Sequence, residues 1–446
     1  MGSMAQLPDE MFTLIKAATS GTGPRLGRLS VSGRRTIETP HYLGLTSRGV
    51  VPHLSQDTFA RDSSISGVYV PLEDYGSSPL RRFIALPEET LLVLGARRTP
   101  PVIAPTANPN TNTTVSICTS VGFRQLAAED YAEAAEKLQA DIVVGLGDIP
   151  YGRVLGSKRI EKATDRQIEW IQDHVCLRKV GNSRSTPARL FAPLLPVPCA
   201  NQQFYIDCLT EGVMKDIQGL AFYDLSPLEG LPDALHHLPR LAFTEPSSPH
   251  EALQHVSLGL DILTVPFVTV ATDSGIALDF SLPAPGQNDA PAALGLDMWL
   301  PSHATDLSPL TQDCQCYTCI NHHRAYVQHL LAAKEMLGWV LLQIHNHCIL
   351  DRFFAGIRQS IADGTYEFDV RKFERAYEPR LPEKSGQGPR IRGYQYKSEG
   401  PGEPKKNAAP FTMLDDQKEK NAESTLSNVE ADAAKLEEHG FAEKEL

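Results

Sequence analysis

Residues 314–319 read Cys314-Gln315-Cys316-Tyr317-Thr318-Cys319, and a largely apolar stretch separates them from the pair His345-Asn346. The spacing is Cys-x-Cys-x2-Cys-x25-His. Three thiolates and one imidazole form a complete ligand set for a tetrahedral zinc ion and leave no position for water. We therefore predict a closed, structural Zn²⁺ site at Cys314, Cys316, Cys319 and His345. The alternative, plain buried thiols or one disulfide with a spare cysteine, is less favoured because an intracellular chain seldom forms disulfides.

The segment between Cys319 and His345 must fold back on itself. As one straight helix it would place the two residues about 39 Å apart at 1.5 Å per residue, too far for one ion to contact both. Its apolar residues recur at helical spacing: Tyr326, Leu330, Leu337, Leu341 and Ile344. This pattern predicts a helical hairpin with its bend near 332–338. His347 is the rival to His345 as fourth ligand.

The composition is that of an ordinary globular chain with a negative charge. The 446 residues are 41% hydrophobic and carry a net charge of −12, which argues against an autonomous nucleic-acid binder of the basic kind. The cysteines outside the zinc motif are scattered singly, which is typical of a reduced compartment: Cys118, Cys176, Cys199, Cys208 and Cys348. No apolar run approaches the length of a membrane span, and the N-terminus lacks the apolar core of a signal peptide.

Short apolar runs alternate with helical patterns from about residue 25 to residue 312. The predicted strands are 41–45, 68–72, 90–94, 141–146, 190–195, 220–223, 241–244 and 262–265. Amphipathic helices are predicted at 127–139, 165–174, 203–217 and 249–258. Repeated strand–helix units imply a parallel sheet, and about eight strands favour an α/β fold of the (β/α)8 TIM-barrel type. The sequence shows neither a G-x-G-x-x-G motif after a strand nor a P-loop, which argues against a nucleotide cofactor.

The pattern divides the chain into four segments. They are an N-terminal extension at 1–24, the TIM barrel at 25–312, an inserted zinc-binding helical subdomain with the final packed helices at 313–378, and a tail at 379–446. Within the third segment, further helical segments are predicted at 352–363 and 368–377. The tail is rich in Gly, Pro and charged residues, so we predict that it is mostly disordered.

Several further stretches accompany the cysteine motif: Arg324-Ala325-Tyr326, His329-Leu330-Leu331, Glu335-Met336-Leu337 and His345-Asn346. Together they resemble the zinc subdomain of the tRNA-guanine transglycosylase family, and the resemblance favours His345 over His347. It extends upstream through Pro239-Arg240-Leu241, Ser248-Pro249, Gly259-Leu260-Asp261, Arg25-Leu26-Gly27 and Glu38-Thr39-Pro40. It implies a TIM barrel with an inserted zinc subdomain. It also implies exchange of guanine at the wobble position of certain tRNAs for a 7-deazaguanine such as queuine.

The sequence differs from the family at the positions of the catalytic residues. The family's enzymes place an aspartate nucleophile at the end of a Gly-x-Asp-x-Phe-Asp run, where it bonds covalently to the ribose. The matching run is Gly259-Leu260-Asp261-Ile262-Leu263-Thr264, so Thr264 occupies the nucleophile position. Asp261 keeps the first aspartate of the run, but its side chain should point differently. Asp273 is the nearest later carboxylate and does not match the motif.

The base-binding positions are changed as well. The aspartate of the family's Asp-Ser-Gly-Gly-Phe-Gln run, which helps to bind and protonate the base, falls at Thr119. The Gln-Gly pair of the base pocket falls at Leu195-Pro196, which cannot offer the same amide donors. Asp148 is either a surviving pocket acid or an aspartate that caps the loop after a strand. We therefore predict no catalytic residue on this chain.

A chain that has the family's scaffold and zinc motif but lacks its catalytic residues resembles the non-catalytic accessory branch of the family. The same resemblance is carried by residues 51–57, 157–159 and 162–166. It implies a heterodimer with a catalytic paralogue, tRNA as a partner, and a cytoplasmic location with peripheral association at the mitochondrial outer membrane.

Two other hypotheses stay open. The chain is either an active transglycosylase with a displaced nucleophile or a zinc-stabilised scaffold without a tRNA role. Four basic pairs are expected to be mostly solvated surface, with some available for tRNA phosphates: Arg34-Arg35, Arg81-Arg82, Arg97-Arg98 and Lys158-Arg159.

Overall fold

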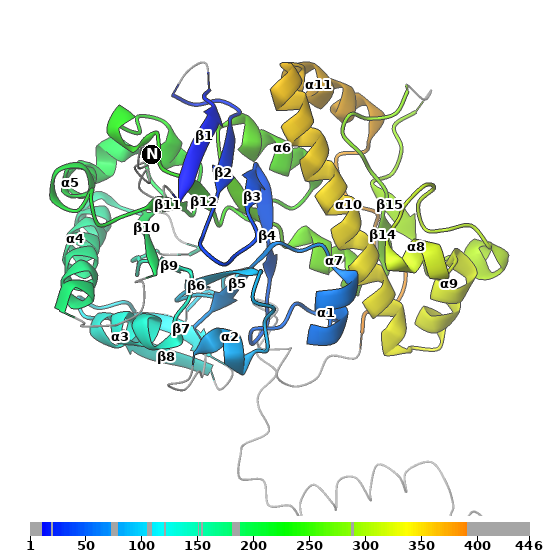
Figure 1. The fold of residues 1–446 in the computed structure, drawn as a ribbon, viewed down its shortest axis with the longest axis horizontal. Helices are drawn as coiled ribbons and strands as arrows, with labels where there is room; N and C mark the ends of the chain where they lie inside the picture. The colour runs from blue at the N-terminus through cyan, green and yellow to red at the C-terminus, as the bar shows by residue number, and fades with distance from the viewer. Residues whose placement is uncertain are drawn as a thin grey trace, which may run out of the picture. The chain divides into compact units, whose positions relative to one another are not determined.

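Figure 1 shows the computed structural model of the chain. The structure describes residues 11–18, 21–72, 79–104, 109–119, 122–149, 151–152, 155–180, 188–286 and 290–389. All elements discussed below belong to the compact unit that ends at Gly400.

A closed barrel of parallel strands organises the fold, which confirms the predicted TIM barrel. Around the barrel the order is β10-β11-β12-β13-β4-β5-β6-β9. Their bounds are β4 His41–Leu45, β5 Gly67–Pro71, β6 Leu91–Gly95, β9 Ile142–Val144, β10 Arg189–Leu194, β11 Gly219–Phe222, β12 Arg240–Ala242 and β13 Ile262–Thr264. These strands are almost continuously apolar because one face fills the barrel and the other meets the helices.

The interior of the barrel is a packed core. Inward side chains from successive strands meet there, among them Leu43, Val93, Phe191 and Leu241. A small antiparallel sheet adds to this core, formed by β1 (Phe12–Lys16), β2 (Leu26–Leu29) and β3 (Ile37–Thr39). Leu29 and Ile37 of this sheet pack into the interior cluster. Since β3 leads directly into β4, the sheet covers the N-terminal end of the barrel and leaves the opposite end for loops.

Helices surround the barrel. They are α1 Gln56–Asp62, α2 Leu80–Phe83, α3 Ala128–Leu138, α4 Ser157–Val180, α5 Gln203–Asp207, α6 Pro249–Ser257 and α7 Phe267–Asp273. The predicted helix at 203–217 is shorter than expected, because helical turns end at Gly212 and the chain then turns to bury Val213 and Ile217. The hairpin of β7 (Thr114–Thr119) and β8 (Gly122–Ala127) was not predicted.

The metal-motif region is built on one long helix. α8 (Tyr317–Asn321) and α9 (Arg324–Ala332) lead to α10 (Met336–Asp363), and α11 (Tyr366–Ala376) follows. The predicted bend is confirmed, since Lys334 has a φ of 60° between α9 and α10. Residues 352–363 are helical as predicted, but they form the second half of α10 and not a further helix, because no proline or glycine turn interrupts α10 before Gly364.

The two halves of α10 belong to different cores. Its first half packs with α9 through Trp339 and Leu331, beside the β-hairpin of β14 (Ile276–Leu278) and β15 (Gly295–Asp297). Its second half places Phe353 and Phe354 in the main core between barrel and helices. Figure 1 shows α10 running beside β4 and α7 toward α8 and α9. Among the described helices, α10 included, there is none with the length and apolar character needed to cross a bilayer.

The first residues of the predicted tail contact the folded unit. Ser385 donates a hydrogen bond to Asp297, and Gly386 lies so close to the Trp299 indole that any Cβ there would overlap it. The rest of the predicted disordered tail, residues 390–446, lies outside the described residues.

Two truncations should separate these parts of the tail. A chain that ends at Pro389 should keep the melting temperature of the full chain, because residues 390–446 offer little apolar surface. A chain that ends at Glu378 should melt about 2–4 °C lower, since it uncovers Trp299. Differential scanning calorimetry measures both. Equal melting temperatures for the two truncations would show that residues 379–389 do not stabilise the fold.

Candidate functional site

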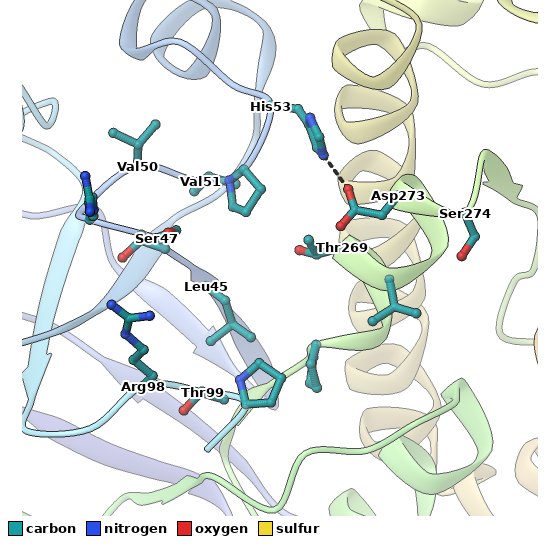
Figure 2. A pocket seen from close by; sticks show the side chains of 16 residues that line it. Leu45, Ser47, Val50, Val51, His53, Arg98, Thr99, Thr269, Asp273 and Ser274 are labelled. Carbon is teal, nitrogen blue, oxygen red and sulfur yellow. Dashed lines mark hydrogen bonds and ion pairs between the residues drawn. The ribbon is translucent and has the colours of Figure 1, made fainter. Parts of the chain in front are cut away.

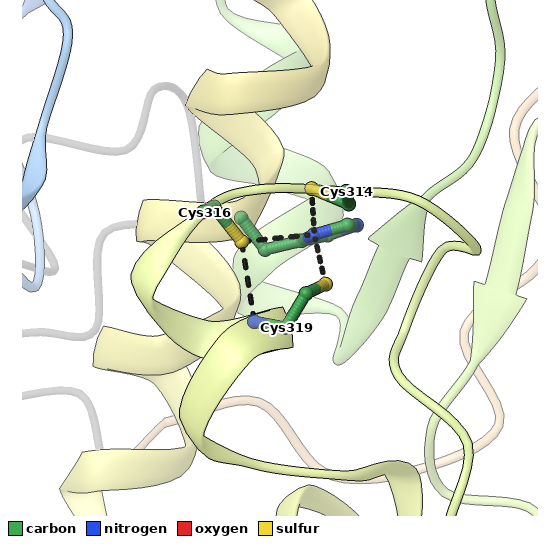
Figure 3. Close-up of side chains that lie close together, drawn as sticks. Cys314, Cys316 and Cys319 are labelled. Atoms are coloured by element: carbon green, nitrogen blue, oxygen red, sulfur yellow. Dashed lines mark hydrogen bonds between the residues drawn. The ribbon is translucent and has the colours of Figure 1, made fainter.

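The structure brings the four predicted ligands together. The Nδ1 atom of His345 lies 3.8 Å from Cys314 Sγ, 3.6 Å from Cys316 Sγ and 3.3 Å from Cys319 Sγ. A tetrahedral ion with bonds of about 2.3 Å to sulfur and 2.0 Å to nitrogen requires sulfur–nitrogen separations of about 3.5 Å. Figure 3 shows the side chains of Cys314, Cys316 and Cys319 directed toward one another, and with His345 their donor atoms all lie within 4.8 Å of one another. The spacing of the donor atoms therefore fits one metal ion.

The surroundings hold His345 in the orientation that a ligand needs. Its Nε2 atom lies 2.9 Å from the backbone oxygen of Leu278, so Nε2 carries the proton and Nδ1 is left to face the thiols. The next residue, Asn346, accepts from the backbone N–H of Leu278 and donates to Thr272 and to the carbonyl of Ile276. These bonds fix α10 to β14 and α7 at the height of the site.

The four donor groups change one another's pKa values. Hydrogen bonds from Cys316 and Cys319 lower the pKa of the Cys314 thiol, and the same contacts with Cys314 raise the pKa values of the other two. Burial lowers the pKa of His345, but the thiols outweigh it and raise the pKa to about 9. A soft divalent cation bound by all three sulfurs as thiolates would displace the protons that the cluster holds without metal.

His347 is not part of the cluster. Its Nδ1 atom lies 3.2 Å from the hydroxyl of Tyr42, and its Nε2 atom lies 3.2 Å from the amide of Gln343. Two residues along a helix turn a side chain by about 200°, which is why His345 and His347 face opposite sides of α10.

Thr264, at the position of the family's nucleophile, is the last residue of strand β13 at the mouth of the barrel. Its side chain is fully buried, and its hydroxyl donates a hydrogen bond to the carbonyl of Ala242 at 3.0 Å. The hydroxyl therefore completes the neighbouring strand instead of facing a substrate.

Asp261 lies at the other end of the same strand and has a structural role. Arg25 contacts both of its carboxylate oxygens, with Nε 2.9 Å from Oδ1, and the backbone N–H of Arg240 donates to Oδ2 at 2.7 Å. Asp261 and Arg25 are both buried. This ion pair connects the start of β13 to the residue just before β2. It lies away from the C-terminal ends of the strands, where TIM barrels place their catalytic residues.

Asp148 follows β9 at the mouth of the barrel, and both of its carboxylate oxygens accept hydrogen bonds from other side chains. Arg159 binds both carboxylate oxygens at 2.6 Å, Arg166 binds one at 2.8 Å, and Asn110 donates at 2.6 Å. Burial alone would raise the pKa of Asp148, but the hydrogen bonds from Arg159 and Asn110 hold it below its usual value. A carboxylate paired in this way binds no base unless the two arginines leave.

The pairing of Asp148 with Arg159 and Arg166 was not predicted from the sequence. Arg159 and Arg166 are seven residues apart on α4, which places them on one face of the helix two turns apart. This spacing, together with an aspartate shortly after a buried strand, could have predicted that the two arginines bind Asp148.

The remaining base-pocket positions are also filled. Thr119 donates its hydroxyl to Gly122 within the β7–β8 hairpin. Leu195 is fully buried in an apolar cluster with Ile149 and Val197. Its backbone groups bond to the side chain of Gln202.

Aromatic side chains close the C-terminal end of the barrel. The ring of Phe243 lies 4.9 Å from Tyr69 and 5.1 Å from Tyr223, and Tyr151 lies 6.4 Å from Tyr223. Arg97 spreads over the Tyr151 ring and donates to backbone carbonyls of the same loops. Burial raises the pKa of Tyr223 to about 12, so its phenol stays neutral. The mouth is packed where a base pocket would need space.

Glu245 is a carboxyl at the same end, on the loop after β12. Burial raises its pKa to about 8, so it is protonated at neutral pH, as a general acid would be. It is the observation that best favours a displaced mechanism.

A cavity of about 440 Å³ lies beside the closed mouth, between the loops after β4 and β6 and helix α7. Figure 2 shows Arg98 on one side and Asp273 on the other, where Asp273 pairs with His53 Nε2 at 2.5 Å. Asp273 is therefore already bound to His53. Arg48 also lines the cavity, which gives it a positive edge and a largely apolar floor.

The basic pairs are used mainly inside the fold. Arg34 and Arg81 both bind Asp141, and Arg97 and Arg159 have the roles described above. Arg35 lies 3.8 Å from Glu89 at the surface.

Comparison with known proteins agrees with this structure. The family model described as queuine tRNA-ribosyltransferase matches residues 20–379. The chain belongs to this family. A protein of Schizosaccharomyces pombe named queuine tRNA-ribosyltransferase accessory subunit 2 is 36% identical over 398 residues, covering 85% of this chain and 88% of the relative.

Two animal relatives carry the same name. The protein of Drosophila mojavensis is 29% identical over 383 residues, covering 79% of this chain and 89% of its own length. The protein of Xenopus tropicalis is 27% identical over 405 residues, covering 77% of this chain and 94% of its own length. The similarity to proteins named accessory subunits therefore spans the barrel and the metal centre together.

Substitution of Asp261 tests its structural role. Asp261→Asn should destabilise the fold by about 3–5 kcal/mol because it leaves Arg25 buried without a counter-charge. The exposed pair of Glu38 and Arg28 is a matched control, and Glu38→Gln should change stability by less than about 0.5 kcal/mol. Urea denaturation measures both free energies of unfolding. Equal stability of the two variants would contradict the structural role.

Proposed function

We propose that this chain is a non-catalytic accessory subunit that supports the exchange of guanine for queuine at the wobble position of tRNA, in a heterodimer with a catalytic paralogue. One observation carries the proposal: Thr264, at the nucleophile position, is buried and donates its hydroxyl to Ala242. The names of the relatives support the accessory role.

The chemistry of base exchange explains why this position matters. The nucleophile must attack the ribose and later leave it, which a carboxylate does readily and an alkoxide does not. An acid must also protonate the departing guanine. In this chain Asp148 is held by Arg159 and Arg166, and the space for the base is taken by aromatic and aliphatic side chains.

The metal centre has a structural role in this proposal, and zinc is the ion that its donors favour. Cys314, Cys316, Cys319 and His345 would hold the ion with no open position, so it supplies cross-links and no bound water. Since these residues come from the loop before α8, from α8 and from α10, metal binding becomes part of the folding free energy.

The exposed sides of α8 and of the first turn of α10 are suited to the catalytic paralogue. Large apolar side chains are exposed on these two helices: Tyr317, Ile320, Met336 and Leu337. We call these four residues the hairpin patch. Large apolar and aromatic side chains exposed on a folded surface are typical of protein interfaces.

The positively edged cavity is a second contact face in this proposal. Arg48 is exposed on the loop after β4, at the C-terminal end of the barrel, where its charge would lie near tRNA phosphates next to the anticodon. A cytoplasmic location with peripheral attachment to the mitochondrial outer membrane is also proposed, on the family resemblance alone, and cell fractionation tests it.

Metal analysis tests the structural site. Purified chain should contain one zinc ion, and Cys316→Ala should lose it and melt at a clearly lower temperature because a ligand is gone. The exposed thiol of Cys176 offers a control, and Cys176→Ala should keep both the zinc and the melting temperature. Inductively coupled plasma mass spectrometry and calorimetry give the two readouts. Full thermal stability of a zinc-free chain would refute a structural metal.

A base-exchange assay tests the function. With labelled guanine in tRNA and queuine as the second substrate, this chain alone should be at least about 10³-fold slower than the heterodimer. Thr264→Asp should restore nothing, because the base pocket remains filled. Exchange by this chain alone that Glu245→Gln abolishes would establish a displaced mechanism in place of the accessory role.

The same assay locates the partner surface. Ile320→Asp should prevent the complex and its activity, since a charge enters the hairpin patch. Phe368→Asp is the control, because Phe368 is equally exposed on α11 at the other end of α10. A silent chain that never binds the paralogue, even without substitution, would favour the scaffold hypothesis.

A further inference from the structure

A fourth cysteine lies against the metal centre. Cys348 follows His345 by one helical turn on α10, and its Sγ atom is 4.0 Å from Cys314 Sγ. Cys348 is half-buried, whereas Cys314 is almost completely covered.

Cys348 is not needed to complete the ligand set. The donor atoms of Cys314, Cys316, Cys319 and His345 all lie within 4.8 Å of one another, and these four groups fill a tetrahedral ion. Cys348 is thus a spare thiol in contact with a ligand. Among the described residues, the remaining cysteines lie in other parts of the fold, where Cys199 bonds to Pro227 and Cys208 contacts Gln172.

We propose that Cys348 makes this metal centre sensitive to peroxide: oxidation joins Cys348 to Cys314 as a disulfide and releases the metal. The reaction needs hydrogen peroxide or another hydroperoxide as the oxidant. One sulfur first attacks the O–O bond and becomes a sulfenic acid, with loss of one water. The second thiol then attacks that sulfur, the S–S bond forms, and a second water leaves. In the metal-loaded chain, Cys314 would be a bound thiolate and Cys348 a thiol: together they lose two electrons and one proton, solvent supplies a second proton, the bond from Cys314 to the metal breaks, and hydrogen peroxide becomes two waters.

The position of the residues favours this pair over disulfides inside the ligand set. Cys314 and Cys316 are separated by one residue, so a bond between them would close a small, strained ring. Cys316 accepts a hydrogen bond from the backbone N–H of Cys319 at the start of α8, which holds its sulfur at that helix end. Cys314 and Cys348 come from different elements, and their sulfurs already lie 4.0 Å apart.

The disulfide would also replace the cross-link that the metal supplies. Loss of Cys314 leaves three ligands for the ion, which weakens its binding. The new bond then ties the loop before α8 to α10, as the ion did. The oxidised chain should therefore stay folded without metal, and a reductant with fresh zinc should restore the starting state.

Zinc release under peroxide tests the proposal on the full chain. Wild type and Cys348→Ser are first matched for zinc content and melting temperature, and Cys176→Ser serves as the control. Hydrogen peroxide is added, a chromophoric zinc chelator follows release, and peptide mapping without reduction identifies disulfides. Wild type and Cys176→Ser should release zinc together and form a Cys314–Cys348 link. Cys348→Ser should release zinc at least about five-fold more slowly and fail to recover with dithiothreitol and zinc.

Each other outcome overturns the proposal. Release from Cys348→Ser at the wild-type rate removes the role of Cys348. Disulfides confined to Cys314, Cys316 and Cys319, or a link from Cys348 to Cys316, identify a different reaction. A Cys348→Ser chain that is purified without zinc would make Cys348 a ligand and not a spare thiol.

Discussion

The fold depends on α10 being a single uninterrupted helix that serves two cores. One half supplies Phe353 and Phe354 to the layer between barrel and helices, and the other half supplies Trp339 and His345 to the metal-motif region. Asn346 bonds the middle of the helix to β14 and α7. Since a helix is stiff along its axis, the packing of α10 against the barrel sets the position of His345. The metal-motif region is therefore attached to the barrel by shared structure and not by a linker.

Three groups at the mouth of the barrel that chemistry could use are paired within the fold, while Glu245 is a buried carboxyl whose pKa is raised to about 8. Thr264 bonds to a strand carbonyl, Asp148 to two arginines, and Asp273 to His53. Aromatic rings fill the space between the strand ends, and Gly95 has no side chain that would collide with Tyr69 there. Such pairing stabilises the barrel, because buried charges are costly unless they are matched. The same pairing leaves the accessory role as the function that this geometry supports best.

Much of this was open to prediction. The strands and the bend at Lys334 follow from hydrophobic periodicity, which reports local burial directly. The metal ligands follow from residue type and spacing, because few other uses bring three cysteines so near a distant histidine. The helix boundaries within α10 did not follow, because apolar residues surround both halves and hide the usual periodicity. The partners of Asp148 were missed because they are contributed by α4 and the loop at Asn110.

The sequence by itself predicted the barrel and the four residues that could hold a metal ion, because these are encoded in local pattern and in the type and spacing of residues. Through the resemblance to the family it also placed Thr264 at the nucleophile position. Tertiary structure alone decided which polar groups are already paired. Asp148 and Asp261 are both aspartates next to barrel strands. Asp148 lies at the mouth of the barrel and pairs with two arginines, whereas Asp261 pairs with Arg25 at the opposite end. The contact of Cys348 with Cys314 is of the same kind. Such pairs join residues far apart in the chain, and only packing in three dimensions brings their atoms within reach.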